Sequence, residues 1–175
     1  MVQEPEIDKA INRYGEAYCK LWEQVRDNPN EFPSGVVSSG TIAEYWVKKY
    51  LEWKYNNSNV SFGLPTQKSW DIKVTYKDGK EVLYQVKSVS LFNKSRKLSP
   101  LVKGFDKLIV ISLDCDFFPF QAYVFQDASV LNGEHNVQAL VVPDPDNKRK
   151  RGSKVFSLAE NIHSEFFGIL GDNLK

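Results

Sequence analysis

The sequence predicts an α/β fold in which a mixed β-sheet is flanked by helices, and three features support this. Apolar residues recur every three to four positions near both ends of the chain and again from residue 41, the spacing of helices that bury one face. Around a turn sequence at 77–80, apolar and polar residues alternate as in a β-hairpin. Residues 108–113 form an almost continuous apolar run, which is typical of a strand covered on both faces.

Length and composition narrow the class of protein. The chain has 175 residues, 42% hydrophobic and 26% charged, with a net charge of +1, which fits one globular domain over 1–175 and excludes a disordered chain. No apolar run is long enough to cross a membrane, and the polar N-terminus is unlike a signal peptide. Cys19 and Cys115 are too few for a disulfide framework or a zinc site. We therefore expect a cytoplasmic protein with no membrane association.

The first expected element is a helix over 7–27, an addition in front of the core. Its apolar side chains form one stripe, Gly15 interrupts it, and Asn28-Pro29 ends it. Dimerisation and target recognition are the roles left open for it.

A second helix is expected to begin near Thr41, after a connector at 31–40. Thr41 suits an N-cap, and Glu44 stands three residues on, in capping-box spacing. Glu44 also falls at the border of the apolar face, where its carboxylate can turn toward the sheet. Both interpretations of Glu44, as a cap and as a site residue, stay open.

Strands are expected at 70–76 and 81–87, and their register decides whether a site exists. A strict two-residue turn at Asp78-Gly79 would pair Asp71 with Val86 and put Asp71 on the wrong face. A one-residue bulge, with Gly79 in a left-handed conformation, would bring Asp71 level with Gln85 or Lys87. We predict a bulge or bend between Asp71 and Gln85.

Shorter signals predict the remaining elements. Ser99-Pro100 is expected to open a short helix, since proline suits the first helical position. Ser157 and Glu160 form a capping-box pattern that predicts the last helix, over 157–170. Further strands are expected at 60–62, 121–125 and 137–142.

The hairpin carries the residues from which chemistry is expected. Gln85 and Lys87 are two apart on a strand and share a face, so with Asp71 they offer two oxygen ligands and an ammonium. Mg²⁺ accepts such ligands together with waters; the backbone carbonyl of Val86 is a further candidate, and Glu44 would restore the charge that neutral Gln85 lacks. A metal activates water and a lysine stabilises charge on a phosphate, so the pattern predicts phosphodiester hydrolysis.

Three segments, GTIAEYWVKKYL, KSWDIKV and VLYQVKS, resemble the PD-(D/E)XK nuclease superfamily, in its Gln-x-Lys variant. The resemblance covers about 40–113. It implies a restriction-endonuclease-like core, within about 40–127, of a helix, a three-stranded meander, a helix and a strand. Trp70 stands where the family has proline, and Gln85 where it has an acid.

The resemblance also implies residue roles and a cofactor. Asp71 and Glu44 would bind Mg²⁺ or Mn²⁺ with Gln85 and the Val86 carbonyl, and Lys87 would be the catalytic lysine. Basic side chains would contact DNA phosphates without reading sequence. The candidates for such contacts, with Tyr45, are Lys94, Arg96, Lys97, Lys103, Lys148, Arg149, Lys150 and Arg151.

We therefore expect a metal-dependent endonuclease that hydrolyses DNA, such as a restriction or defence enzyme. A homodimer would suit it, because cutting both strands takes two sites. Two alternatives stay open. One is a catalytically weak or inactive nuclease-fold domain that binds nucleic acid or assembles with a partner. The other is a small-molecule enzyme or interaction module on an unrelated α/β fold, with Asp71 capping a strand and Lys87 facing solvent.

Overall fold

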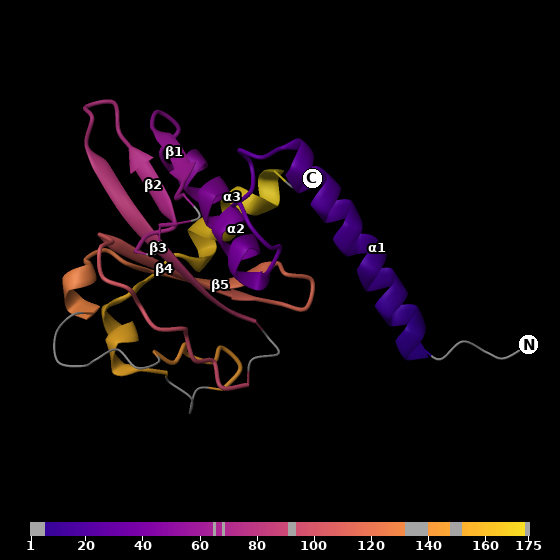
Figure 1. Cartoon of the computed structure of the whole chain (residues 1–175). Helices are drawn as coiled ribbons and strands as arrows, with labels where there is room; N and C mark the ends of the chain where they lie inside the picture. Colours follow the sequence, from indigo (N-terminus) through magenta and orange to yellow (C-terminus); the bar gives the residue numbers. More distant parts are fainter. Residues whose placement is uncertain are drawn as a thin grey trace, which may run out of the picture.

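A computed structural model describes residues 6–64, 66–67, 69–90, 94–131, 140–147 and 152–173. The α/β fold with a mixed sheet flanked by helices is confirmed. The elements follow in the order α1 (Glu6–Asp27), α2 (Ser39–Lys54), β1 (Asn59–Phe62), β2 (Ile72–Thr75), β3 (Glu81–Ser90), β4 (Lys107–Leu113), β5 (Pro119–Phe125), η1 (Ala128–Leu131), η2 (Lys154–Leu158), β6 (Glu160–Asn161) and α3 (His163–Asn173) (Figure 1).

Within the described residues, one sheet joins six strands in sequence order, from β1 to β6. Only β3 and β4 pair in parallel, and every other neighbouring pair is antiparallel. The sheet therefore begins with the expected three-stranded meander, followed by β4 in parallel.

The hairpin between β2 and β3 has the shifted register that the sequence predicted. Gly79 adopts φ +81°, and the N–H of Tyr76 donates to the carbonyl of Lys80 at 2.8 Å, closing a three-residue loop. Ile72 consequently pairs with Tyr84. A strict two-residue turn would have paired Ile72 with Gln85 instead and moved every β2 side chain to the other face.

The start of α2 differs from the expectation. Ser38 is the N-cap, its hydroxyl accepts from the N–H of Thr41 at 3.2 Å, and the Thr41 hydroxyl accepts from the N–H of Ser38 at 2.8 Å. Thr41 is thus the third helical residue, and the capping role considered for Glu44 is wrong. Glu44 lies in the second turn of the helix, so its side chain takes no part in the N-terminal cap.

One expected helix is absent from the described residues, and the last expected helix begins later than predicted. At 94–106, backbone groups pair with the segment at 140–142 instead: the N–H of Leu98 donates to Leu140, and the N–H of Val142 donates to Arg96. Ser157 does not open the last α-helix, because it lies in the 3₁₀ helix η2 and Glu160 pairs with Val124 as part of β6. α3 begins only at His163. Of the strand expected at 137–142, residues 137–139 lie outside the described part, and Val141 forms a single bridge with Lys97.

Apolar side chains pack on both faces of the sheet. One cluster lies under α2 and α3 and includes Val47, Leu51, Ile72, Ile111 and Phe166. The opposite cluster lies under the 94–106 and 140–159 segments and includes Val89, Leu108, Val110, Phe125 and Phe156. β4 contributes to both clusters, which explains its almost continuous apolar sequence.

The helix expected at 7–27 is present as α1, but it is not part of either cluster. It leaves the rest of the molecule as an arm (Figure 1), and none of its residues is buried. Among the described helices, α1 included, none combines the length and apolar character that crossing a membrane requires.

Candidate functional site

The site forms where β2 ends against β3. β2 begins at Ile72, so from Gln85 onward β3 is paired only with β4. Asp71 stands at this opening: its N–H donates to the carbonyl of Tyr84, and its carboxylate accepts from the N–H of Val86, at 2.8 and 2.7 Å. These two contacts bracket Gln85. The acid is therefore held beside the Gln-x-Lys segment by backbone bonds, as the predicted bend required.

Glu44 reaches the same place from α2. It lines, together with Asp71, a cavity of about 150 Å³, whose other walls are Pro33, Ser34, Thr41, Gly63, Leu64, Gln67 and Trp70. Burial raises the pKa of Glu44 to about 8; the charge of Asp71 adds to the rise and that of Lys87 opposes it. Burial also raises the pKa of Asp71, against the N–H of Val86 and the charge of Lys87. Two desolvated carboxylates thus share one small volume.

Gln85, the residue that these backbone contacts bracket, presents an unused oxygen. The side chain is 2% exposed, and its Nε2 donates to the carbonyl of Ser69 at 3.4 Å. Its Oε1 is buried and has no hydrogen-bond partner among the described residues. Leaving a buried amide oxygen unpaired costs about 1–3 kcal/mol, so such an atom calls for a partner that the described residues do not supply.

Lys87 completes the group. It is half-buried, and its Nζ donates to the hydroxyl of Ser99 at 3.1 Å. Burial lowers the pKa of Lys87, while the charges of Asp71 and Glu44 raise it. The ammonium is therefore near both carboxylates yet paired directly with neither, which leaves it able to meet an incoming anion.

The oxygen donors fit a hard divalent cation. Two carboxylates and one unpaired amide oxygen are enough for Mg²⁺, which keeps several waters when bound to proteins. Within the described residues, no three His, Cys, Asp or Glu side chains gather in a metal-binding group, so a cation here would depend on Gln85 or on a backbone carbonyl as its third ligand. Val86 is 6% exposed and its N–H is occupied by Asp71; its carbonyl remains a predicted ligand.

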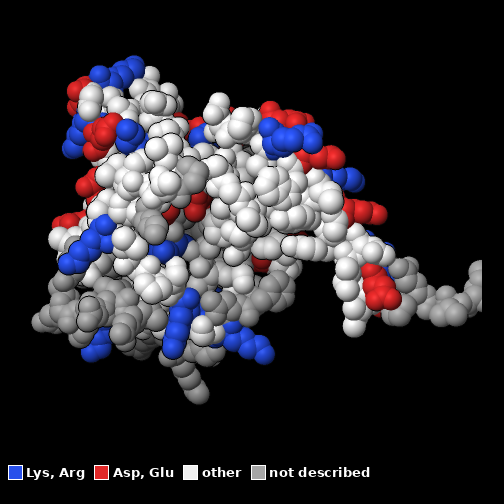
Figure 2. Space-filling model, viewed as in Figure 1, with Lys and Arg blue, Asp and Glu red and all other residues white. Residues whose placement is uncertain are grey.

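The basic residues expected to contact phosphate divide into three groups. Lys94, Lys97 and Lys103 are exposed. For Arg96 the expectation is wrong: it is 8% exposed, and its guanidinium donates inward to Gln121 and Ser112, at 2.7 and 3.1 Å, and to the carbonyls of Val142 and Pro143. Residues 148–151 lie outside the described part. Figure 2 shows Lys and Arg atoms below the middle of this face, beneath a recessed acidic group.

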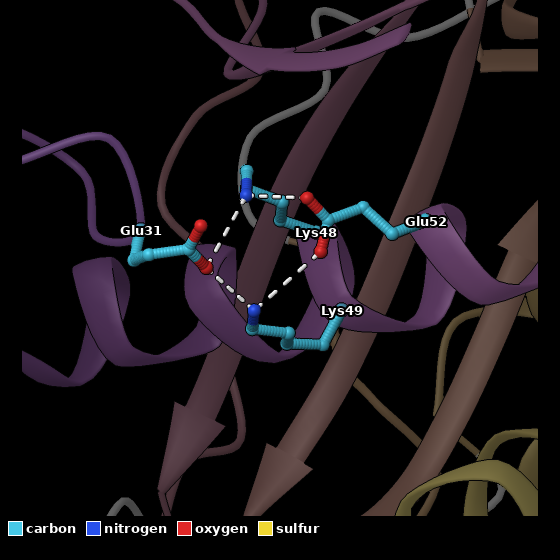
Figure 3. Close-up of polar contacts among 4 residues, drawn as sticks. All are labelled: Glu31, Lys48, Lys49 and Glu52. Carbon is cyan, nitrogen blue, oxygen red and sulfur yellow. Dashed lines mark hydrogen bonds and ion pairs between the residues drawn. The ribbon is translucent and has the colours of Figure 1, made fainter. Parts of the chain in front are cut away.

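The connector before α2 is a site component that the sequence did not reveal. Pro33 and Ser34 line the cavity with Glu44 and Asp71. An ion-pair network fixes the connector just before them, because Glu31 contacts Lys49 at 2.6 Å and Lys48 at 3.8 Å, and both lysines contact Glu52 (Figure 3). Lys48 is 4% exposed, so this network is not merely a surface contact. Connector and α2 are thus fastened together beside the site.

Other contributions also come from loops. Ser69 and Ser99 orient Gln85 and Lys87, respectively, and each is far from its partner in sequence. Neither serine carries a sequence signal that links it to its partner, so only the fold could reveal the two contacts.

Comparison with known proteins adds a distant likeness. No protein-family model matches the chain, and no curated protein matches it. Among solved structures, it is similar to the bacterial homing endonuclease I-Ssp6803I, with 21% sequence identity and a TM-score of 0.43 over 78% of this chain and 96% of that one.

Proposed function

We propose that this protein is a metal-dependent endonuclease of the PD-(D/E)XK type, in its Gln-x-Lys variant, which hydrolyses DNA phosphodiester bonds. The observation that carries the proposal is the buried Oε1 of Gln85, which has no hydrogen-bond partner among the described residues and belongs to the residue that the contacts of the desolvated Asp71 bracket. A structural role for these residues would leave that oxygen without purpose. A divalent cation would supply its missing partner and neutralise both acids.

Each side chain has a role that follows from its position. Asp71, oriented by the N–H of Val86, would hold the cation together with Glu44 and Gln85. The bound cation would supply an activated water and polarise the phosphate. Lys87 follows Gln85 by two residues on the same strand, and Ser99 holds its ammonium group. This ammonium would orient the water and offset the charge developing on the phosphate oxygens.

Glu44 makes the site dependent on pH. With a pKa of about 8, it carries a proton at neutral pH and must release it before binding a cation. The cation and the proton therefore compete for one carboxylate, and activity is expected to rise as pH increases toward 8.

Plasmid cleavage tests the proposal. With Mg²⁺ or Mn²⁺, the wild type is expected to nick or linearise supercoiled DNA, and Asp71→Asn and Lys87→Met are expected to lose at least about a hundredfold in rate, the usual cost of removing a group that stabilises transition-state charge. Asp78→Asn, in the hairpin turn, and Lys73→Met, on β2, change the same residue types outside the site and should cleave normally.

Two outcomes would reject the proposal. Equal cleavage by the wild type and both site variants would remove the assigned residues from the reaction. Salt-dependent DNA binding without metal-dependent cleavage would instead select an inactive nuclease-fold domain. The family resemblance implies a restriction or defence role for the active form.

A further inference from the structure

α1 carries a seven-residue apolar repeat that its own chain covers only in part. Successive stripe positions are separated by alternate steps of four and three residues, the spacing of a two-helix seam. The six positions of this stripe are Ile7, Ile11, Tyr14, Tyr18, Leu21 and Val25. In Figure 2 most charged atoms of the arm lie along its outer edge, and its inner edge is uncharged.

The two halves of the stripe have different surroundings. Leu21 and Val25 face the body across an apolar groove of about 470 Å³, whose far wall includes Phe32, Ile42 and Trp46. Ile7 and Ile11 continue the same stripe past the body, where they remain 72% and 61% exposed. One chain thus offers both an apolar projection and an unfilled apolar groove.

We propose that a second copy of this chain covers α1, with the two α1 helices antiparallel about a two-fold axis. In that arrangement Ile7 and Ile11 of each copy lie near Val25 and Leu21 of the other and enter its groove, and Tyr14 lies near Tyr18. A two-fold pairing covers the exposed isoleucines and fills the groove of both copies, because the same contact occurs twice. This inference does not rest on the proposed function.

The surface area available reaches the lower limit for a specific dimer. Ile7, Ile11, Tyr14 and Trp22 are 72%, 61%, 63% and 36% exposed. Since large side chains present roughly 150–250 Å² each, these fractions leave about 400 Å² per chain. The groove adds a smaller area, so the two copies together would bury roughly 1,000 Å², near the lower limit for a specific interface.

The residues beside the stripe also permit close approach. Six positions lie directly beside the stripe in the seven-residue repeat, and five of them are uncharged. Three of these five, Ala10, Gly15 and Ala17, are also small, so neither bulky side chains nor like charges separate the two helices. The remaining position, Asp8, would lie near Trp22 of the other copy and meet no like charge.

The groove and the candidate site share a wall. Glu31 and Phe32 line the groove, and the next two residues, Pro33 and Ser34, line the cavity that holds Glu44. A second copy in the groove would press on the segment that closes the site.

Sedimentation of the full chain tests the pairing. At tens of micromolar, the wild type is expected to sediment as a dimer, and Ile7→Glu/Ile11→Glu is expected to weaken the dimer at least about tenfold. Cys19→Glu adds charge to an exposed position on the other side of α1 and should leave the dimer unchanged. Circular dichroism checks that α1 stays helical, and Ile11→Ala provides a milder variant if it does not.

Cross-linking tests the direction of pairing. In a background with Cys19 and Cys115 replaced by serine, Ile7→Cys/Val25→Cys is expected to form a disulfide-linked dimer. A monomeric wild type, including one whose α1 has folded onto its own body, would overturn the inference. So would a dimer that is insensitive to the Ile7→Glu/Ile11→Glu change, or cross-linking only through Ile7→Cys alone.

Discussion

The raised pKa of Glu44 makes the stability of the protein depend on pH. Its carboxyl has an ordinary pKa of 4.5 in an unfolded chain and about 8 in the folded protein, because the cavity excludes water and Asp71 stands nearby. The folded state therefore binds more protons than the unfolded state between those two values. By linkage, the free energy of unfolding falls as pH rises through that window and levels off above it.

Glu44→Gln should remove this dependence. Between about pH 4.5 and 8, the wild type is expected to lose up to a few kcal/mol of stability that the variant keeps, since glutamine has no proton to release. Urea unfolding at several pH values measures the difference between the two proteins. Glu16→Gln, on the exposed side of α1, should follow the wild type; parallel curves for wild type and Glu44→Gln would contradict the assigned pKa.

At the scale of elements, the local turn was predictable and the long-range pairings were not. The sequence at 77–80 predicted a bulged loop and so the position of Asp71, because glycine is the residue that tolerates a positive φ there. Glu160 follows Ser157 in a capping pattern, but its backbone pairs with Val124, thirty-six positions earlier. A local motif carries no information about such a distant partner.

The site residues also divide into those that the local sequence could place together and those that long-range contacts bring in. Asp71, Gln85 and Lys87 lie on one hairpin, so strand periodicity could place them together. The contributions of Ser69, Ser99 and the 33–34 segment depend on loops folded over that hairpin, and a loop's path is set by contacts that no short segment records.

Gly79 tests the turn directly. Gly79→Ala is expected to destabilise the protein by about 1 kcal/mol, because φ +81° is unfavourable for alanine while no neighbouring atom obstructs the added methyl group. Gly168→Ala makes the same change in α3, also in open space but in a helix, and is expected to stabilise by about 0.5–1 kcal/mol. Thermal or urea unfolding compares them; equal shifts of the same sign would show that backbone conformation is not the cause.

At the scale of the whole molecule, the proposed metal site would couple cation binding, proton release and stability. An apo protein near neutral pH holds a proton on Glu44, and a cation would displace it while satisfying the unpaired oxygen of Gln85. Binding to the folded state alone would also raise the unfolding temperature, by mass action. Ion affinity, proton count and thermal stability should therefore change together.

Calorimetric titration with Mn²⁺ or Mg²⁺ measures that coupling. At pH 7, binding is expected to release close to one proton, seen as a heat that varies with the ionisation enthalpy of the buffer, and the affinity should increase until pH exceeds about 8. Glu44→Gln should abolish the proton release, and Asp71→Asn should abolish binding and the rise in unfolding temperature. Asp78→Asn, whose carboxylate accepts a turn N–H, should behave as the wild type. Binding without proton release would mean that the cation does not use Glu44, and binding that survives Asp71→Asn would move the metal site away from the β2–β3 opening.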